Sequence, residues 1–229
     1  MASIKLSAIL SDIRGFLQGC TYARNHYGLF MRKSAYPGYM RTPAQATDRD
    51  LFQSVTTVWN TLTEEQRQLW ATAASETPKK NCFGDTYFPD GFHLFISCNV
   101  NLLLVGLPQI SEPVYNNDLS GITGFTLSWS PPPNTAFLID FGTGGTTQNI
   151  RCTIAASPGL NLGINYCQNK YRKISIIPEG SGSQWNFWKE YRDRFGLPVS
   201  NTKIFVKIRI INSLSGISGL TLHNSIIIS

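Results

Sequence analysis

The chain has 229 residues, a length that suits one large domain or two small ones. Hydrophobic residues make up 42% of the chain and charged residues only 15%. This composition excludes intrinsic disorder, and it leaves so little charged surface that we expect much of the surface to be buried in an assembly. The longest apolar run, residues 100–105, is interrupted by Asn101. It is too short to cross a bilayer, so we expect no membrane span.

The N-terminus and the cysteines favour a protein made in a reducing cytoplasm. The first residues lack a continuous apolar segment followed by a small-residue cleavage site, so we expect no signal peptide. Five cysteines form an odd set without a C-x-x-C pair: Cys20, Cys82, Cys98, Cys152 and Cys167. This pattern predicts free, partly buried thiols rather than a disulfide framework or a zinc site.

The net charge of +6 is unevenly distributed along the chain. Residues 1–41 contain six basic residues and one acidic residue. Residues 42–109 contain four basic and seven acidic residues, and residues 110–229 contain ten basic and six acidic residues. The distribution of charge therefore divides the chain into three parts. We expect a basic extended arm at 1–41, a helical region at 42–109 and a β-domain at 110–229.

The arm contains a hairpin pattern within residues 20–34. Strand-like residues 21–24 and 29–32 flank the turn residues 25–28, and aromatic and basic side chains alternate along them. The residues Pro37 and Gly38 then interrupt the chain.

Three helices are expected in residues 42–109. Two capping boxes, Thr42 with Gln45 and Thr63 with Gln66, begin a pair of helices joined by a tight turn. Asp90 caps a third helix, which ends at Gly106. Apolar residues recur at three- and four-residue spacing. They predict a helical-hairpin core of Phe52, Trp59, Leu62, Leu69 and Trp70.

From about residue 110 the apolar period changes from 3.6 to 2. Six segments separated by Gly, Pro, Asn and Ser are strand candidates: 125–129, 136–140, 150–155, 171–177, 203–210 and 222–228. They predict an antiparallel β-sandwich with a short helical insertion at 184–195, and the fold class is therefore α+β. The insertion carries Trp185, Trp188, Tyr191 and Phe195 on one face.

No motif for catalysis, a cofactor or a metal is visible. His26, His93 and His223 lack ligand spacing, and the Gly-rich residues 141–147 lack the lysine of a P-loop. The acidic pairs Asp48/Asp50 and Glu64/Glu65 lie in first turns of helices, where they compensate the helix dipole. We therefore expect no enzyme, no cofactor and no metal site.

Nucleic-acid binding is an open alternative for the arm. The helix pair invites comparison with a helix-turn-helix, but residues 42–77 hold two basic and five acidic residues, the wrong sign for a surface that faces phosphates. In the arm, Arg24, Arg32 and Lys33 lie among aromatic residues, which suits single strands. The favoured interpretation is that the arm pairs with an acidic surface of a neighbouring subunit.

The residues Arg41-Thr42-Pro43-Ala44-Gln45, followed by Trp59-x-x-Leu62-Thr63-x-x-Gln66-Arg67-x-x-Trp70, resemble a pattern of bacteriophage virion structural proteins. Such proteins commonly begin with a basic hairpin arm, here 15–33, and continue with a Phe-Gly loop and an apolar helix. The resemblance covers residues 1–107, although Gly38-Tyr39-Met40 departs from the usual approach to the motif. Residues 110–229 resemble an immunoglobulin-like or fibronectin-type sandwich, with Trp129 in an early strand.

The resemblance implies a virion component, made in the host cytoplasm and located in the capsid, a vertex, the connector or the tail. Its partners would be other virion proteins or copies of itself. Candidate assembly contacts are Arg14, Arg24, Arg32, Lys33, Trp185 and Trp188. For the two tryptophans, packing on their own domain is the slightly favoured alternative to a subunit contact. A host-surface adhesion module that uses the sandwich is a further alternative.

Overall fold

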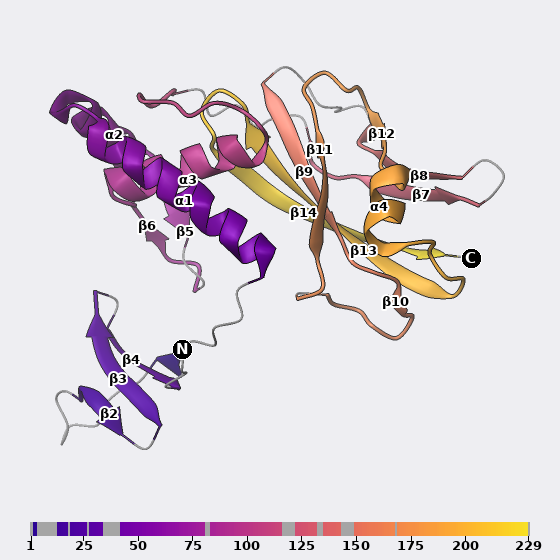
Figure 1. Cartoon of the computed structure of the whole chain (residues 1–229), viewed down its shortest axis with the longest axis horizontal. Helices are drawn as coiled ribbons and strands as arrows, with labels where there is room; N and C mark the ends of the chain where they lie inside the picture. The colour runs from indigo at the N-terminus through magenta and orange to yellow at the C-terminus, as the bar shows by residue number, and fades with distance from the viewer. Residues whose placement is uncertain are drawn as a thin grey trace. The chain divides into compact units, whose positions relative to one another are not determined.

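The computed structural model describes residues 2–3, 13–17, 19–26, 28–33, 42–80, 83–115, 122–131, 135–142, 149–167 and 169–228. The chain divides into two compact units, residues 1–47 and residues 48–229. Helices and antiparallel strands occur together, so the expected α+β class is confirmed (Figure 1).

The first unit contains an antiparallel sheet, called the arm sheet below, with the strand order β1-β4-β3-β2. Its strands are β1 (Ala2–Ser3), β2 (Gly15–Leu17), β3 (Cys20–Asn25) and β4 (Gly28–Lys33). The predicted hairpin is confirmed, because β3 and β4 pair from Cys20 with Lys33 to Asn25 with Gly28. Gly28 follows the turn with a φ of +113°, a conformation that other residues rarely adopt.

Three helices follow at the predicted places: α1 (Pro43–Thr61), α2 (Glu64–Glu76) and α3 (Gly91–Leu104). Both capping boxes form. The backbone amide of Gln66 donates to the Thr63 hydroxyl over 3.3 Å, and the Thr63 amide donates to the Gln66 side chain over 3.1 Å. Thr42 and Gln45 make the same reciprocal pair. Two short strands, β5 (Lys79–Lys80) and β6 (Thr86–Tyr87), lie between α2 and α3.

The helical core contains three of the five residues predicted for it. Leu62 and Trp70 are buried, and Trp59 is partly buried with its ring against Phe92 and Phe95 of α3. Phe52 and Leu69 are not core residues: 51% and 42% of their surfaces are exposed.

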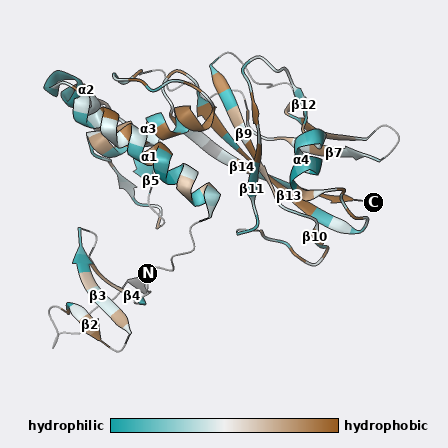
Figure 2. Cartoon of the chain, in the orientation of Figure 1, coloured by the Kyte–Doolittle hydropathy of each residue, from teal (hydrophilic) through white to brown (hydrophobic). Residues whose placement is uncertain are grey.

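The two wrong assignments have simple causes. Leu69 lies next to Trp70 along α2, off the face that buries Trp70, Ala73 and Ala74. Phe52 continues the apolar stripe of α1 toward the N-terminus, but the first buried residue of that helix is Val55. The N-terminal turns of α1 are largely hydrophilic, and their side chains 43–50 are all exposed (Figure 2). Periodicity marks the face of a helix but not where its packing partner ends.

The six predicted strands all form, together with two short ones. The strands are β7 (Thr126–Ser130), β8 (Ala136–Asp140), β9 (Ile150–Ala156), β10 (Leu160–Asn161), β11 (Arg172–Ile177), β12 (Gln184–Asn186), β13 (Thr202–Asn212) and β14 (Ser218–Ile228). One sheet contains β12-β8-β7, and another contains β10, β13, β9 and β11, with β14 paired to β13. Both sheets contribute to one core, which includes Phe137, Ile139, Ile154 and Ile208. The arrangement of these sheets as a sandwich stays a prediction.

The helical insertion is shorter than expected. Residues 184–186 form β12, which pairs with β8, and only Trp188–Phe195 forms the helix α4. The apolar spacing of this segment suits a helix throughout, but pairing of Trp185 with Ile139 satisfies the backbone in the sheet instead. The helix α4 packs against β8 and β11.

Polar contacts join the helices to the strands of the second unit. The Lys173 ammonium donates to the carbonyl of Leu104 over 2.6 Å, and the Arg151 guanidinium donates to the carbonyl of Val105 over 3.0 Å. Both cations therefore lie at the negative end of the α3 dipole. Inside the unit, the Asn101 side chain donates to the carbonyl of Gly216 over 2.8 Å. No helix among the described residues is long and apolar enough to cross a membrane.

Candidate functional site

One face of the arm sheet combines an apolar centre with two cations. Directly paired residues of neighbouring strands share a face of a sheet, and so do residues two apart along one strand. On β3, Cys20, Tyr22 and Arg24 therefore point to the same side. Their partners Lys33, Met31 and Leu29 on β4, and Leu17 on β2, point to that side as well. We call this surface the apolar arm face: Leu17, Cys20, Tyr22, Leu29 and Met31, with Arg24 and Lys33.

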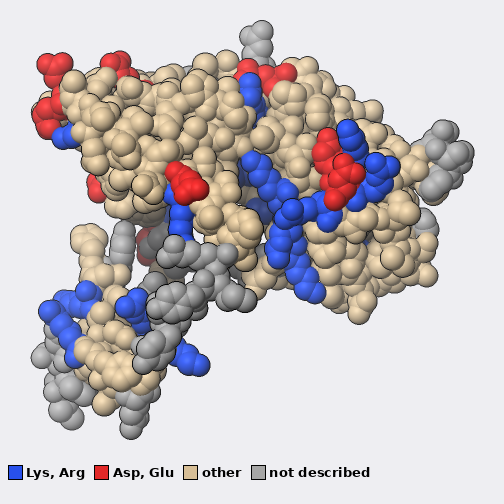
Figure 3. Space-filling model, in the orientation of Figure 1, with Lys and Arg blue, Asp and Glu red and all other residues tan. Residues whose placement is uncertain are grey.

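The structure separates the four basic residues that were predicted as assembly contacts. Arg24 and Lys33 belong to the apolar arm face, whereas Arg32 pairs with Thr21 and points to the opposite side. Arg14 lies immediately before β2. Residues 13–33 contain no Asp or Glu, and blue side chains are visible on the arm sheet (Figure 3).

Among residues 13–47, no side chain that the structure describes is buried. The half-buried residues are Ile13 and the first four positions of β3 and of β4, whereas Phe16 and Leu17 are 68% and 60% exposed. A small antiparallel sheet needs a covered apolar face for independent stability. Among the described residues of this unit, the apolar side chains of the sheet stay accessible.

Residues 59–70 of the helical-hairpin motif make structural contacts within the fold. Arg67 donates to the carbonyl oxygens of Trp59 and Asn60 over 3.4 and 3.2 Å, at the C-terminus of α1, and its guanidinium lies 5.9 Å from the Trp59 ring centroid. The Trp70 indole donates to the carbonyl of Ser111 over 2.8 Å. With Leu62 buried and Thr63 capping, these side chains are used within the fold.

The aromatic residues around α4 face their own domain. Trp188 packs against Trp129 at 5.1 Å between ring centroids, and Trp185 also contacts the core of the two sheets. The rings of Phe187 and Tyr191 are buried there. The favoured alternative of internal packing is the arrangement observed. On the outside of α4, cationic and acidic side chains lie close together (Figure 3).

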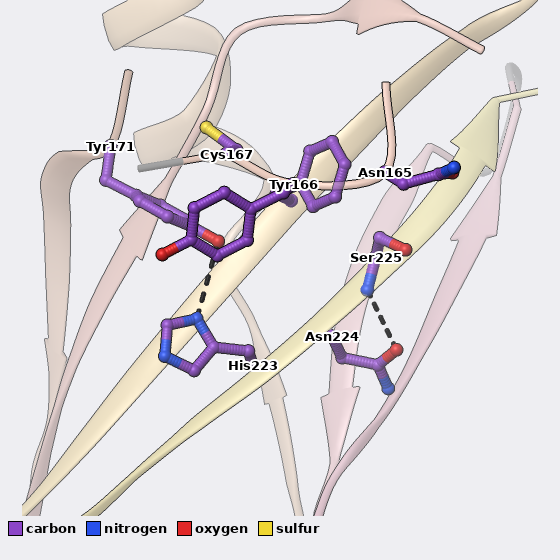
Figure 4. Close-up of a pocket in the computed structure, with 8 residues that line it drawn as sticks. Asn165, Tyr166, Cys167, Tyr171, His223, Asn224 and Ser225 are labelled. Carbon is purple, nitrogen blue, oxygen red and sulfur yellow. Dashed lines mark hydrogen bonds between the residues drawn. The ribbon is translucent and has the colours of Figure 1, made fainter. Parts of the chain in front are cut away.

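A cavity of about 330 Å³ opens on the outer face of the larger sheet (Figure 4). It lies between the loop before β11 and the strands β13 and β14. Its lining residues are Asn165, Tyr166, Cys167, Tyr171, Phe205, His223, Asn224 and Ser225. A second hollow of about 320 Å³ shares Tyr166 and Cys167 with it and is also lined by Lys170.

The polar groups of this cavity are held in place from several elements. The Tyr171 hydroxyl shares a hydrogen bond of 3.5 Å with Nδ1 of His223 (Figure 4). Burial raises the pKa of Tyr171, and nearby Cys167 and Tyr166 raise it further, so the hydroxyl keeps its proton. Lys207 pairs with His223 in the sheet, and its Nζ atom lies 5.9 Å from the Tyr171 ring centroid.

The cavity cannot be recognised from the sequence, because its residues come from three separate segments without a recognisable spacing. His223 has the pattern of an ordinary strand histidine, and Tyr166 lies in a loop. One signal was available. Residues 141–178 and 194–229 each contain four basic residues and no acidic one. These two segments supply the lining residues of the cavity.

Within the described part of the chain, no three His, Cys, Asp or Glu residues are grouped so that they could hold a metal ion. Burial raises the pKa of both Cys98 and Cys152 to about 12, which makes these thiols unreactive. The Gly-rich residues 143–148, the motif approach 34–41 and Cys82 lie outside the described residues.

Comparisons with known proteins returned nothing for this chain. No protein-family model, no curated protein and no solved structure matches it.

Proposed function

We propose that this chain is a structural component of a bacteriophage virion, and that it assembles through its N-terminal arm and its helical region. The observation that supports the proposal best is the apolar arm face. Its central side chains are only half-buried, and Arg24 and Lys33 flank them. A face of this kind gains stability when a partner covers its apolar centre and supplies negative charge to its rim.

The partner in this proposal is the helical region of a second copy. Residues 42–109 carry seven acidic residues against four basic ones, and Asp48 and Asp50 lie on the exposed first half of α1. Phe52, which is 51% exposed, follows Asp48 by one turn of the helix and adds an apolar contact next to that carboxylate. The two surfaces are complementary in charge and in apolar character. In this arrangement the two sheets of the β-domain form an immunoglobulin-like sandwich that faces a neighbour or solvent.

Sedimentation velocity of the full chain tests the contact with a matched pair of variants. Arg24→Glu with Lys33→Glu reverses charge on the apolar arm face, and Arg32→Glu reverses charge on the opposite side of the same strands. We expect the first variant to shift the protein toward monomer and the second to assemble normally. Asp48→Lys with Asp50→Lys in a mixed partner should restore association. Equal behaviour of the two arm variants would refute the contact.

The virion role has its own test. Mass spectrometry of purified particles of the phage that encodes the chain should find it at a fixed ratio to the major virion proteins. If the chain is made during infection and is absent from purified particles, the proposed role is wrong.

A further inference from the structure

We propose that the cavity beside Tyr166 is a binding site for single-stranded nucleic acid, in which bases stack on exposed tyrosine and phosphates contact surrounding lysines. The site lies on the β-domain and does not use the arm. The inference is independent of the proposed virion role, since it concerns binding by the free protein.

Lysine side chains surround the site. The segments that build the site, residues 141–178 and 194–229, contain eight basic residues and no carboxylate. Lys170 lines the second hollow, Lys207 lies at the Tyr171 ring, and the Lys203 ammonium lies 5.2 Å from the centroid of the Phe205 ring. No Asp or Glu is among the residues that line either hollow. A ligand that carries repeated negative charge therefore meets lysines and no carboxylate among the lining residues.

Tyr166 gives the site an exposed aromatic surface. The side chain of Tyr166 is 73% exposed, although it stands between two hollows that are otherwise lined by apolar and polar groups. Tyr171 lies beside it with its hydroxyl toward His223 (Figure 4). A flat, exposed ring with neighbouring cations is the combination that holds unpaired bases, and each stacked base contributes about 1–3 kcal/mol.

The shape of the site suits a chain of flat units. The two hollows have similar volumes, about 330 and 320 Å³, and they meet at Tyr166. A chain of flat units can place one unit on each side of that ring. The side chains of Asn165 and Ser225 and the ring of His223 then offer hydrogen bonds to base edges. A duplex keeps its bases stacked inside the helix and cannot present their faces to the tyrosine, so the geometry favours a single strand.

A neutral oligosaccharide could also stack on Tyr166, but it would gain nothing from the cations. An acidic oligosaccharide would use both features. The experiment below therefore includes it as a competing ligand.

The test is fluorescence anisotropy of the full chain with a labelled 12-nucleotide oligo-dT, together with a duplex of the same length and an acidic oligosaccharide. We expect saturable binding to oligo-dT that weakens as salt rises, and weaker binding to the duplex. Tyr166→Ala should lower the affinity for oligo-dT about 5- to 150-fold, the range that corresponds to loss of one stacked base. Lys170→Gln with Lys207→Gln should reduce the salt slope by about 1.4.

Two controls locate the binding. Tyr115→Ala removes a tyrosine that is 57% exposed and does not line either hollow, and it should bind as the unchanged protein does. Arg24→Gln with Lys33→Gln removes charge from the arm alone and should retain the stacking-dependent binding. Circular dichroism melting confirms that each variant is folded.

Three results would overturn the inference. They are no binding to oligo-dT at low salt, binding that is unaffected by Tyr166→Ala, and binding that is lost only with the arm variant. If the acidic oligosaccharide binds in a Tyr166-dependent way and oligo-dT does not, the site is a glycan site and the nucleic-acid assignment is wrong.

Discussion

Replacing Gly216 by alanine tests how tightly the β13–β14 turn is held against α3. Gly216 has a φ of +71°, and an added Cβ would lie 2.8 Å from the carbonyl carbon of Cys98 and closer still to its oxygen. The turn cannot move away freely, because the Gly216 carbonyl accepts the hydrogen bond from Asn101. Left-handed backbone costs an alanine about 1–2 kcal/mol, and overpacking adds about 1–3 kcal/mol.

Gly180→Ala is the matched control. Gly180 has a φ of +67°, but an added Cβ would meet nothing within 4 Å. The Gly180→Ala variant should therefore lose only the free energy that left-handed backbone costs an alanine. At about 2–4 °C per kcal/mol for a chain of this size, we expect Gly216→Ala to lower the melting temperature by roughly 4–20 °C and Gly180→Ala by roughly 2–8 °C. Calorimetry measures both values. Equal losses at the two glycines would refute the claim that the turn is pressed against α3.

Three further predictions follow from the packing. Arg67→Ala should lower the unfolding free energy by about 1–2 kcal/mol in chemical denaturation, because the cap of α1 and the contact with Trp59 are lost; an unchanged midpoint would contradict this. Trp188→Ala should cost the isolated protein about 2 kcal/mol, since its ring packs on Trp129; unchanged melting with lost association would favour a subunit contact instead. Alkylation at pH 8 should leave Cys98 and Cys152 unmodified until denaturant is added, because at that pH a thiol with a pKa near 12 is almost wholly protonated. Labelling of either thiol in the native protein would show that its core opens.

Local signals in the sequence predicted most of the secondary structure. Capping pairs such as Thr63 with Gln66 involve residues three apart, so the bonds that begin a helix can be read from the sequence alone. The strand candidates were found because Gly, Pro, Asn and Ser separate them, and alternation then marks their faces. The segment 184–186 was assigned to a helix because its competing partner, β8, lies more than forty residues away along the chain.

The candidate sites depended on such distant partners and were predicted only in part. The apolar arm face follows from the register of β3 with β4, which the hairpin pattern does indicate. The cavity requires the loop around Tyr166 to close over β13 and β14, and nothing in the local pattern specifies that packing. The sequence does show that residues 194–229 contain no acidic residue. A motif search does not detect this signal, because it looks for residues that are present.

The helical-hairpin motif shows why a resemblance and a function are separate matters in this protein. Its residues cap one helix, join it to the next and fill the core, as the contacts of Thr63, Arg67 and Trp70 demonstrate. Substituting Thr63 or Arg67 would weaken the helical hairpin, and substituting Trp70 would remove part of its core, whatever the protein does. The motif therefore specifies a way to build the hairpin. The apolar arm face and the cavity beside Tyr166 are two surfaces available for partners, and neither contains a residue of the motif. Variants on these two surfaces, rather than in the motif, can therefore separate loss of function from loss of fold.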